Sequence, residues 1–135
     1  MVLAVLESRA GISFAGRDVY LNIAGGLRVT EPAADLAVAA ALVSAFAEHP
    51  LAADSVVFGE ISLSGALRPI SQPDARLREA KKLGFSVAFA PLPMKTLEDS
   101  GLILNKVNDL ASFVDLCFGD LGKSEARERS DEWKA

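Results

Sequence analysis

The sequence predicts an α+β domain in which helices pack against a mixed β-sheet. Segments with strand and helix periodicity alternate along the chain in a ββα, ββα, β(β)α order. Two prolines, Pro32 and Pro73, stand where helices would begin. The chain has 135 residues, of which 50% are hydrophobic and 24% charged. This composition suits one domain whose core needs neither a disulfide nor a structural metal.

The amino-terminal part predicts one helix followed by a β-hairpin. Residues 1–10 carry apolar side chains at helical spacing, and Gly11 would end the helix. Because the helix starts at Met1 with no capping residue before it, we expect the chain to be a fragment of a longer protein. The alternating residues 18–24 predict a strand that pairs with 27–30 across a tight glycine turn.

The longest predicted helix covers residues 32–48. Pro32 has the fixed φ that suits a first helical position, and Thr30 or Glu31 could bind the free amides. The alanine-rich body of the helix allows close packing, and Pro50 requires the helix to end before it.

The second half alternates short strands with two more helices. Strands are expected over 55–63, 66–70, 85–90 and 102–105, with a turn at Ser64-Gly65. Helices are expected over 73–83, closed by Gly84, and over 107–118. Residues 120–135 hold nine charges in sixteen positions, which predicts a charged, flexible tail after a domain of residues 1–119.

Several classes of protein are excluded by what the sequence lacks. One cysteine and one histidine rule out a disulfide framework and the usual zinc ligand sets, and we expect no cofactor in this chain. Cys117 stands in an apolar run and is expected to be a small buried hydrophobic residue. No apolar run approaches the roughly 20 residues that span a membrane, and no secretory leader is visible. We therefore expect a cytoplasmic protein without a membrane partner.

Two segments resemble known families. The run DVYLNIAGG at 18–26, followed by EPAADLA at 31–37, resembles the signature of the C-terminal domain of bacterial RadA (Sms) proteins. That family is a RecA paralogue in DNA repair. The run GEISLSG at 59–65, followed by Arg68-Pro69-Ile70, resembles the GEITLxGxVxPI segment of Lon peptidases. The resemblance covers roughly residues 1–92 and implies the fold of the proteolytic domain of Lon.

The resemblance to Lon also implies where a catalytic dyad would lie. The nucleophilic serine of Lon belongs to a PSAG segment, which is matched here by Pro32-Ala33-Ala34-Asp35, so Ala33 takes its position. Counting on from the GEI segment, the position of the catalytic lysine falls on Arg76. Alanine has no attacking atom, and arginine stays protonated and cannot act as a general base. The resemblance thus implies a degenerate peptidase domain that is not an enzyme.

A local excess of basic residues occurs in a chain whose formal charge is −4. Between Ile61 and Phe85, two acids are outnumbered by Arg68, Arg76, Arg78, Lys81 and Lys82. The last three share one helical face, which could hold phosphates or could simply be solvated. The RadA resemblance favours double-stranded DNA. It makes Arg28, near the dyad by analogy, and Arg76 the first candidates for contact, with Arg68 and Arg78 next.

Three functions remain open from the sequence. The favoured one is a non-catalytic module of a RadA-type repair and recombination ATPase that binds duplex DNA and helps to form a homo-oligomer, expected to be a hexameric ring. No GxxxxGK[S/T] phosphate loop occurs in the chain, so the partner ATPase domain is expected outside it. The alternative is a ring-forming domain without DNA contact. An active Ser–Lys peptidase is disfavoured by Ala33 and Arg76.

Overall fold

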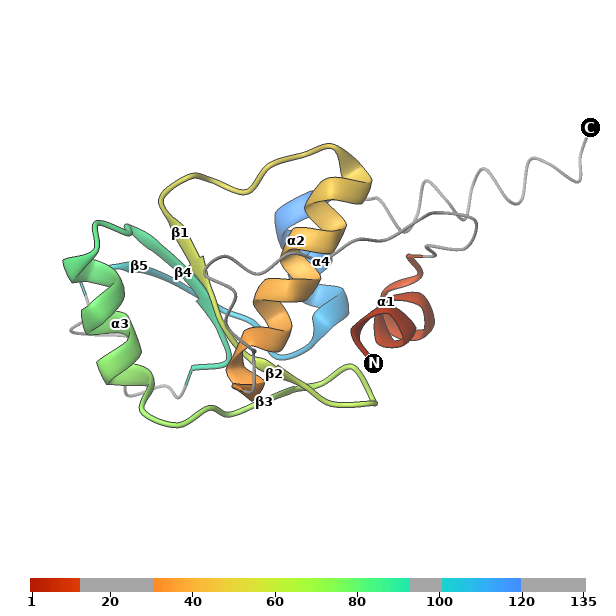
Figure 1. Cartoon of the computed structure of the whole chain (residues 1–135), viewed down its shortest axis with the longest axis horizontal. Helices are drawn as coiled ribbons and strands as arrows, with labels where there is room; N and C mark the ends of the chain where they lie inside the picture. Colours follow the sequence, from red (N-terminus) through yellow and green to blue (C-terminus); the bar gives the residue numbers. More distant parts are fainter. Residues whose placement is uncertain (13–30, 93–100, 120–135) are drawn as a thin grey trace, which may run out of the picture.

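A computed structural model describes residues 1–12, 31–92 and 101–119 of the chain (Figure 1). In this part of the chain a parallel sheet of three strands lies beside an antiparallel pair. Helices cover both faces of the larger sheet. The combination of helices with parallel and antiparallel pairing confirms the predicted α+β class.

The larger sheet has the strand order β1-β4-β5, and both pairings are parallel. At its centre Phe89 is in register with Val57 on one side and with Asn105 on the other. The smaller pair, β2 and β3, is joined by a turn at Gly65, where φ is 87°. The strands are β1 (Ser55–Val57), β2 (Glu60–Ile61), β3 (Leu67–Arg68), β4 (Val87–Ala90) and β5 (Ile103–Lys106).

Local capping explains where the helices begin and end. Gly11 closes the first helix in the left-handed region, and the Asp109 side chain caps the last by accepting the Ser112 N–H at 2.7 Å. The 3₁₀ turn η2 leads directly into the longest helix. The bounds are α1 (Val2–Ala10), η2 (Pro32–Ala34), α2 (Asp35–Ala47), α3 (Pro73–Lys82) and α4 (Leu110–Phe118).

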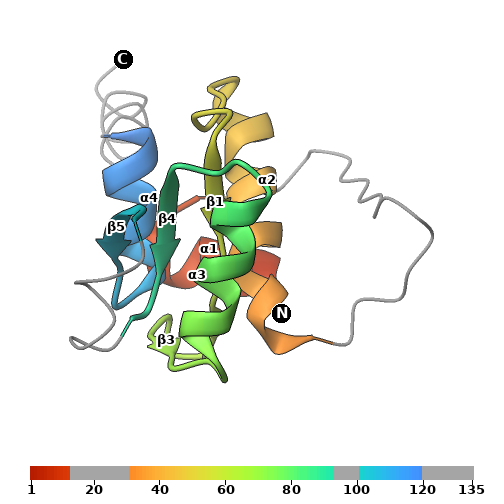
Figure 2. The same cartoon turned by 90° about the vertical axis from the view of Figure 1, so that its left-hand side faces the viewer.

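Alternate residues of the strands supply two hydrophobic clusters, one on each face of the sheet. Phe89 points toward the cluster built by α1, α2 and α4, where its ring meets Phe113 edge-on with centroids 5.9 Å apart. Its neighbours Ala88 and Ala90 point the other way and pack with Leu77 of α3. As Figures 1 and 2 show, α3 therefore covers the face of the sheet opposite α2 and α4.

Most predicted elements are present, with small shifts at their ends. The helices expected over 1–10, 32–48 and 73–83 and the strands over 85–90 and 102–105 are confirmed. The helix expected from 107 starts at Leu110, because the Val107 N–H still bonds to Ala90 O. The hairpin predicted over 18–30 and the tail predicted over 120–135 lie outside the described residues.

The strand predicted over 55–63 is wrong as a single element. After Val57 the Phe58 N–H still reaches Phe89 O, but Gly59 then bonds to the start of α2 instead of continuing the sheet. From Glu60 the chain forms β2, which pairs with β3 instead of with the larger sheet. The return strand predicted over 66–70 is likewise reduced to Leu67–Arg68, with a single bridge from Ala66 to Asp109.

Candidate functional site

The segment that carries Ala33 is fixed to the chain around Gly59 by backbone hydrogen bonds. The Gly59 N–H donates to Ala33 O at 2.8 Å, and Gly59 O accepts the Leu36 N–H at 3.0 Å. The Ala33 residue is only 3% exposed. The position matched to the serine of Lon therefore holds a methyl group inside the protein, with no nucleophilic atom.

Asp35 adds a side-chain contact to the same junction. Its Oδ2 atom accepts the backbone N–H of Ile61 at 3.1 Å in a partly buried setting. A side chain at Gly59 would be crowded, because its Cβ would lie 3.1 Å from Pro91 Cδ. The first turn of α2 and strand β2 are thus held together closely.

Arg76 lies in the first turn of α3 and reaches the same region. One guanidinium nitrogen, Nη2, donates to Glu31 Oε1 at 2.9 Å, and Nε donates to Ser71 O at 2.9 Å. Glu31 is two residues before Ala33, so the two dyad positions identified by resemblance belong to adjacent segments. The carboxylate beside Arg76 also balances its charge.

The other basic candidates differ in how far their charges are balanced. Arg68 lies 3.6 Å from Glu60 across the β2–β3 pair and keeps 63% of its side chain exposed. Arg78, Lys81 and Lys82 are exposed on α3, and none forms an ion pair with another described residue. The Lys81 ammonium lies beside Gly101. Arg28 is not among the described residues.

Cys117 lies on α4. Burial raises the pKa of its thiol from 9.0 to about 11, because the thiolate is poorly solvated there. Cys117 was predicted to be a small buried hydrophobic residue, and it packs against the larger hydrophobic cluster while remaining only partly buried. A high pKa makes this cysteine a weak nucleophile at neutral pH.

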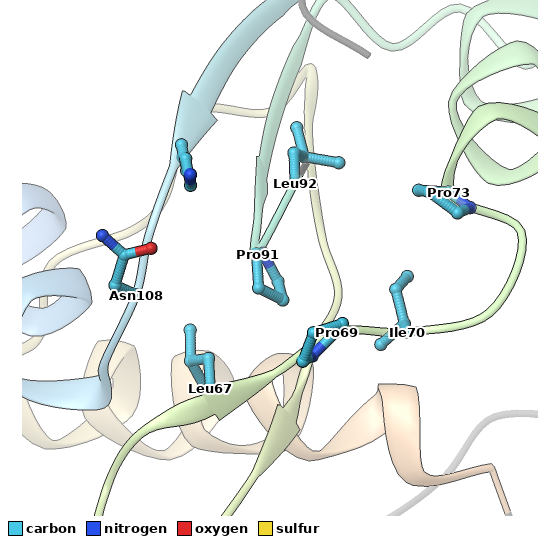
Figure 3. Close-up of a pocket in the computed structure, with 8 residues that line it drawn as sticks. Leu67, Pro69, Ile70, Pro73, Pro91, Leu92 and Asn108 are labelled. Carbon is cyan, nitrogen blue, oxygen red and sulfur yellow. The ribbon is translucent and has the colours of Figure 1, made fainter. Parts of the chain in front are cut away.

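A cleft of about 390 Å³ opens at the carboxyl ends of β4 and β5 (Figure 3). Its lining comes from four separate segments, so no sequence motif could have revealed it. The lining residues are Leu67, Pro69, Ile70, Pro73, Pro91, Leu92, Lys106 and Asn108. The cleft neighbours the Ala33 junction, because Pro91 also packs toward Gly59.

The described residues contain neither a metal-ligand cluster nor a membrane-spanning helix. Within 1–12, 31–92 and 101–119, no group of three or more His, Cys, Asp or Glu side chains could hold a metal ion. None of the helices in those ranges is both long and apolar enough to cross a bilayer.

Comparison with known proteins identifies relatives for most of the chain. The family described as "Subunit ChlI of Mg-chelatase" matches residues 1–93. The chain is 62% identical to "DNA repair protein RadA" of Brucella abortus over 91 residues, which are 67% of this chain and 20% of that protein. It is 48% identical to the Synechocystis protein of the same name over 113 residues, 84% of this chain and 22% of that protein.

A third relative, "DNA repair protein RadA" of Aquifex aeolicus, is 42% identical over 118 residues, 87% of this chain and 26% of that protein. The chain thus spans only about a fifth to a quarter of the length of these relatives. The RadA resemblance seen in residues 18–37 is confirmed. The chain belongs to the family described as subunit ChlI of Mg-chelatase, and proteins named DNA repair protein RadA are among its homologues.

Proposed function

We propose that this chain is a non-catalytic domain of a RadA-type DNA repair and recombination protein, and that it binds duplex DNA and supports oligomeric assembly. Its partners are double-stranded DNA, further copies of itself in a hexameric ring, and an ATPase domain elsewhere in the parent protein. It works in the cytoplasm and uses no cofactor of its own.

The absence of peptidase chemistry is supported by the surroundings of Ala33 and Arg76. A Ser–Lys dyad needs a hydroxyl that substrate can reach and a neutral amine beside it. Position 33 offers a methyl group that is 3% exposed, and position 76 offers a guanidinium held by Glu31. Both features oppose a nucleophilic attack on a peptide bond.

The DNA-binding role rests on one observation, the unbalanced cations of α3. Arg78, Lys81 and Lys82 are exposed at helical spacing and have no ion-pair partner in the described part of the chain. Unbalanced cations attract phosphates more strongly than cations already next to a carboxylate. We therefore rank these three above Arg68 and Arg76, and Arg28 remains a candidate beyond the described residues.

The test measures duplex binding by fluorescence anisotropy at low salt, with the parent chain and an Arg78→Ala, Lys81→Ala, Lys82→Ala variant. The parent should bind two unrelated duplexes equally, because phosphates carry no sequence information. The triple variant should bind both at least tenfold more weakly, at roughly threefold or more for each lost contact. Arg9→Ala, at an exposed position of α1, is the control and should bind like the parent.

A second variant tests the sign of the effect. Asp74 and Glu79 are exposed acids on the same helix. Asp74→Asn with Glu79→Gln removes two negative charges without shortening a side chain, so duplex affinity should rise. If neither the basic nor the acidic changes alter binding, α3 is a solvated face and DNA contact through it is disproved.

A ring-forming domain without DNA contact is the alternative, and one feature of α2 favours it. Ala37, Ala41 and Ala45 are exposed at every fourth position, so they form a row of small residues along one side of the helix. Such a row allows another helix to approach closely. Ala41→Glu should then prevent assembly, as measured by light scattering, whereas the α3 triple variant should assemble normally.

A further inference from the structure

The cleft at the carboxyl ends of β4 and β5 combines an apolar lining with a few polar groups. Three prolines and three aliphatic residues form most of its wall (Figure 3). Lys106, the last residue of β5, and Asn108, two residues further on, add polar groups to the lining. Its volume of about 390 Å³ falls in the range of binding sites for small ligands. The carboxyl ends of parallel strands are also where ligands usually bind in such sheets.

The polar groups in this lining are mainly hydrogen-bond donors without acceptors. Lys106 forms no ion pair, and the Asn108 carboxamide forms no hydrogen bond, with any residue of the described ranges. Leu92 is only 2% exposed, yet its backbone N–H is bonded to no described residue. Buried amides are nearly always paired in folded proteins. The occupant of the cleft is therefore expected to supply acceptors.

We propose that this cleft binds the carboxyl-terminal end of a polypeptide whose last residue is aliphatic. The terminal carboxylate accepts from the Lys106 ammonium and the Asn108 amide, and the last side chain packs among Pro69, Pro73 and Pro91. A carboxylate is the acceptor that an ammonium and an amide bind together most strongly. This inference does not depend on the DNA-binding role.

A peptide end fits these groups better than a small carboxylic acid. Besides Leu92, the backbone N–H of the half-buried Ile70 has no acceptor among the described residues. Leu92 and Ile70 follow different strands, β4 and β3, and both line the cleft together with Lys106. A peptide carries an additional carbonyl for each residue, and these carbonyls can accept the N–H groups of Leu92 and Ile70.

The test uses a dye-labelled Gly-Ser-Gly-Ala-Leu peptide with a free carboxylate, and follows its anisotropy on titration with the parent chain. The same peptide with an amidated end should bind at least about tenfold more weakly, because the charge-assisted hydrogen bonds are lost. A peptide ending in Gly should also bind about tenfold more weakly, since the apolar contact is removed. The Leu92 amide resonance should shift on titration with the free-acid peptide.

Variants distinguish this site from general charge attraction. Lys106→Gln and Asn108→Ala should each lower the affinity for the free-acid peptide several-fold and leave the affinity for the amidated peptide unchanged. Arg9→Gln, a cation on α1 outside the cleft, should bind the peptide like the parent. Equal binding of the acid and the amide, or no binding at millimolar protein, would overturn the proposal. Displacement of the peptide by 4-methylpentanoate at the peptide's own concentration would instead assign the cleft to small carboxylic acids.

Discussion

Ala33 and Arg76 could be located from the sequence because each lies at a fixed spacing from a recognisable segment. Their surroundings could not be predicted. The ion pair between Arg76 and Glu31 joins residues 45 positions apart, and the hydrogen bond from Ile61 to Asp35 joins residues 26 apart. Contacts of this kind depend on how helices and strands pack, which a local sequence pattern does not contain.

The burial of position 33 predicts the result of rebuilding the dyad. Ala33→Ser with Arg76→Lys should still cleave no casein, because a serine at a site that is 3% exposed cannot reach a substrate. The new lysine would also lie beside Glu31, which favours its charged form. Release of labelled fragments from casein measures this. Cleavage by the parent chain that is lost in Ser62→Ala would contradict the non-catalytic account.

Cys117 supports a prediction about pH. Because burial raises the pKa of the thiol from 9.0 to about 11, the folded protein holds this proton more tightly than the unfolded chain. The resulting contribution to stability is complete below pH 9 and is lost as the pH rises through about 11. At pH 8 the thiolate fraction should be lower in the folded state by up to about two orders of magnitude.

The rate of reaction with Ellman's reagent at pH 8 measures the thiolate fraction of Cys117. The native protein should react far more slowly than the same protein in 8 M urea (roughly the concentration that unfolds small domains). Equal rates in the two conditions would show that the thiol is not protected.

At the scale of the element, sequence patterns gave the type of each helix and strand more reliably than its ends. The apolar run at 55–63 contains no residue that forbids a continuous strand. It divides at Gly59 because that backbone bonds to Ala33 and Leu36, a tertiary contact. Helices 32–48 and 73–83 were easier to predict, since local residues mark both ends of each. The first lies between Pro32 and Pro50, and the second between Pro73 and Gly84.

Gly84 and Gly65 both lie in turns with positive φ. Adding a side chain at Gly84 would strain the backbone only, whereas adding one at Gly65 would also cause a steric clash. Gly84 has φ 96° and open space around it, so Gly84→Ala should cost about 1 kcal/mol of unfolding free energy from backbone strain. Gly65 has φ 87°, and a Cβ there would lie 2.9 Å from Arg9 Cβ. Its carbonyl also accepts the Leu110 N–H at 2.8 Å.

Gly65→Ala should therefore cost clearly more than Gly84→Ala in urea denaturation, by about another 1 kcal/mol or more. The β2–β3 turn would then be an essential link between α1 and α4. If the two substitutions cost the same, the contact between the turn and α1 contributes nothing to stability.

At the scale of the whole molecule, the layered arrangement separates the functions we propose. The larger hydrophobic cluster with α1, α2 and α4 lies on one face of the sheet, and the basic helix α3 lies on the other (Figure 1). A formal charge of −4 gives no general attraction to DNA. Binding must therefore come from a local surface, and α3 is the described element that offers one.

The salt dependence of duplex binding tests this central claim most directly. The logarithm of the association constant should fall linearly with the logarithm of salt concentration, since each phosphate contact releases counterions. The Arg78→Ala, Lys81→Ala, Lys82→Ala variant should show a slope about 3 units flatter than the parent, at about 0.9 for each lost contact. A variant that assembles like the parent and has the same affinity and the same slope would contradict DNA binding through α3.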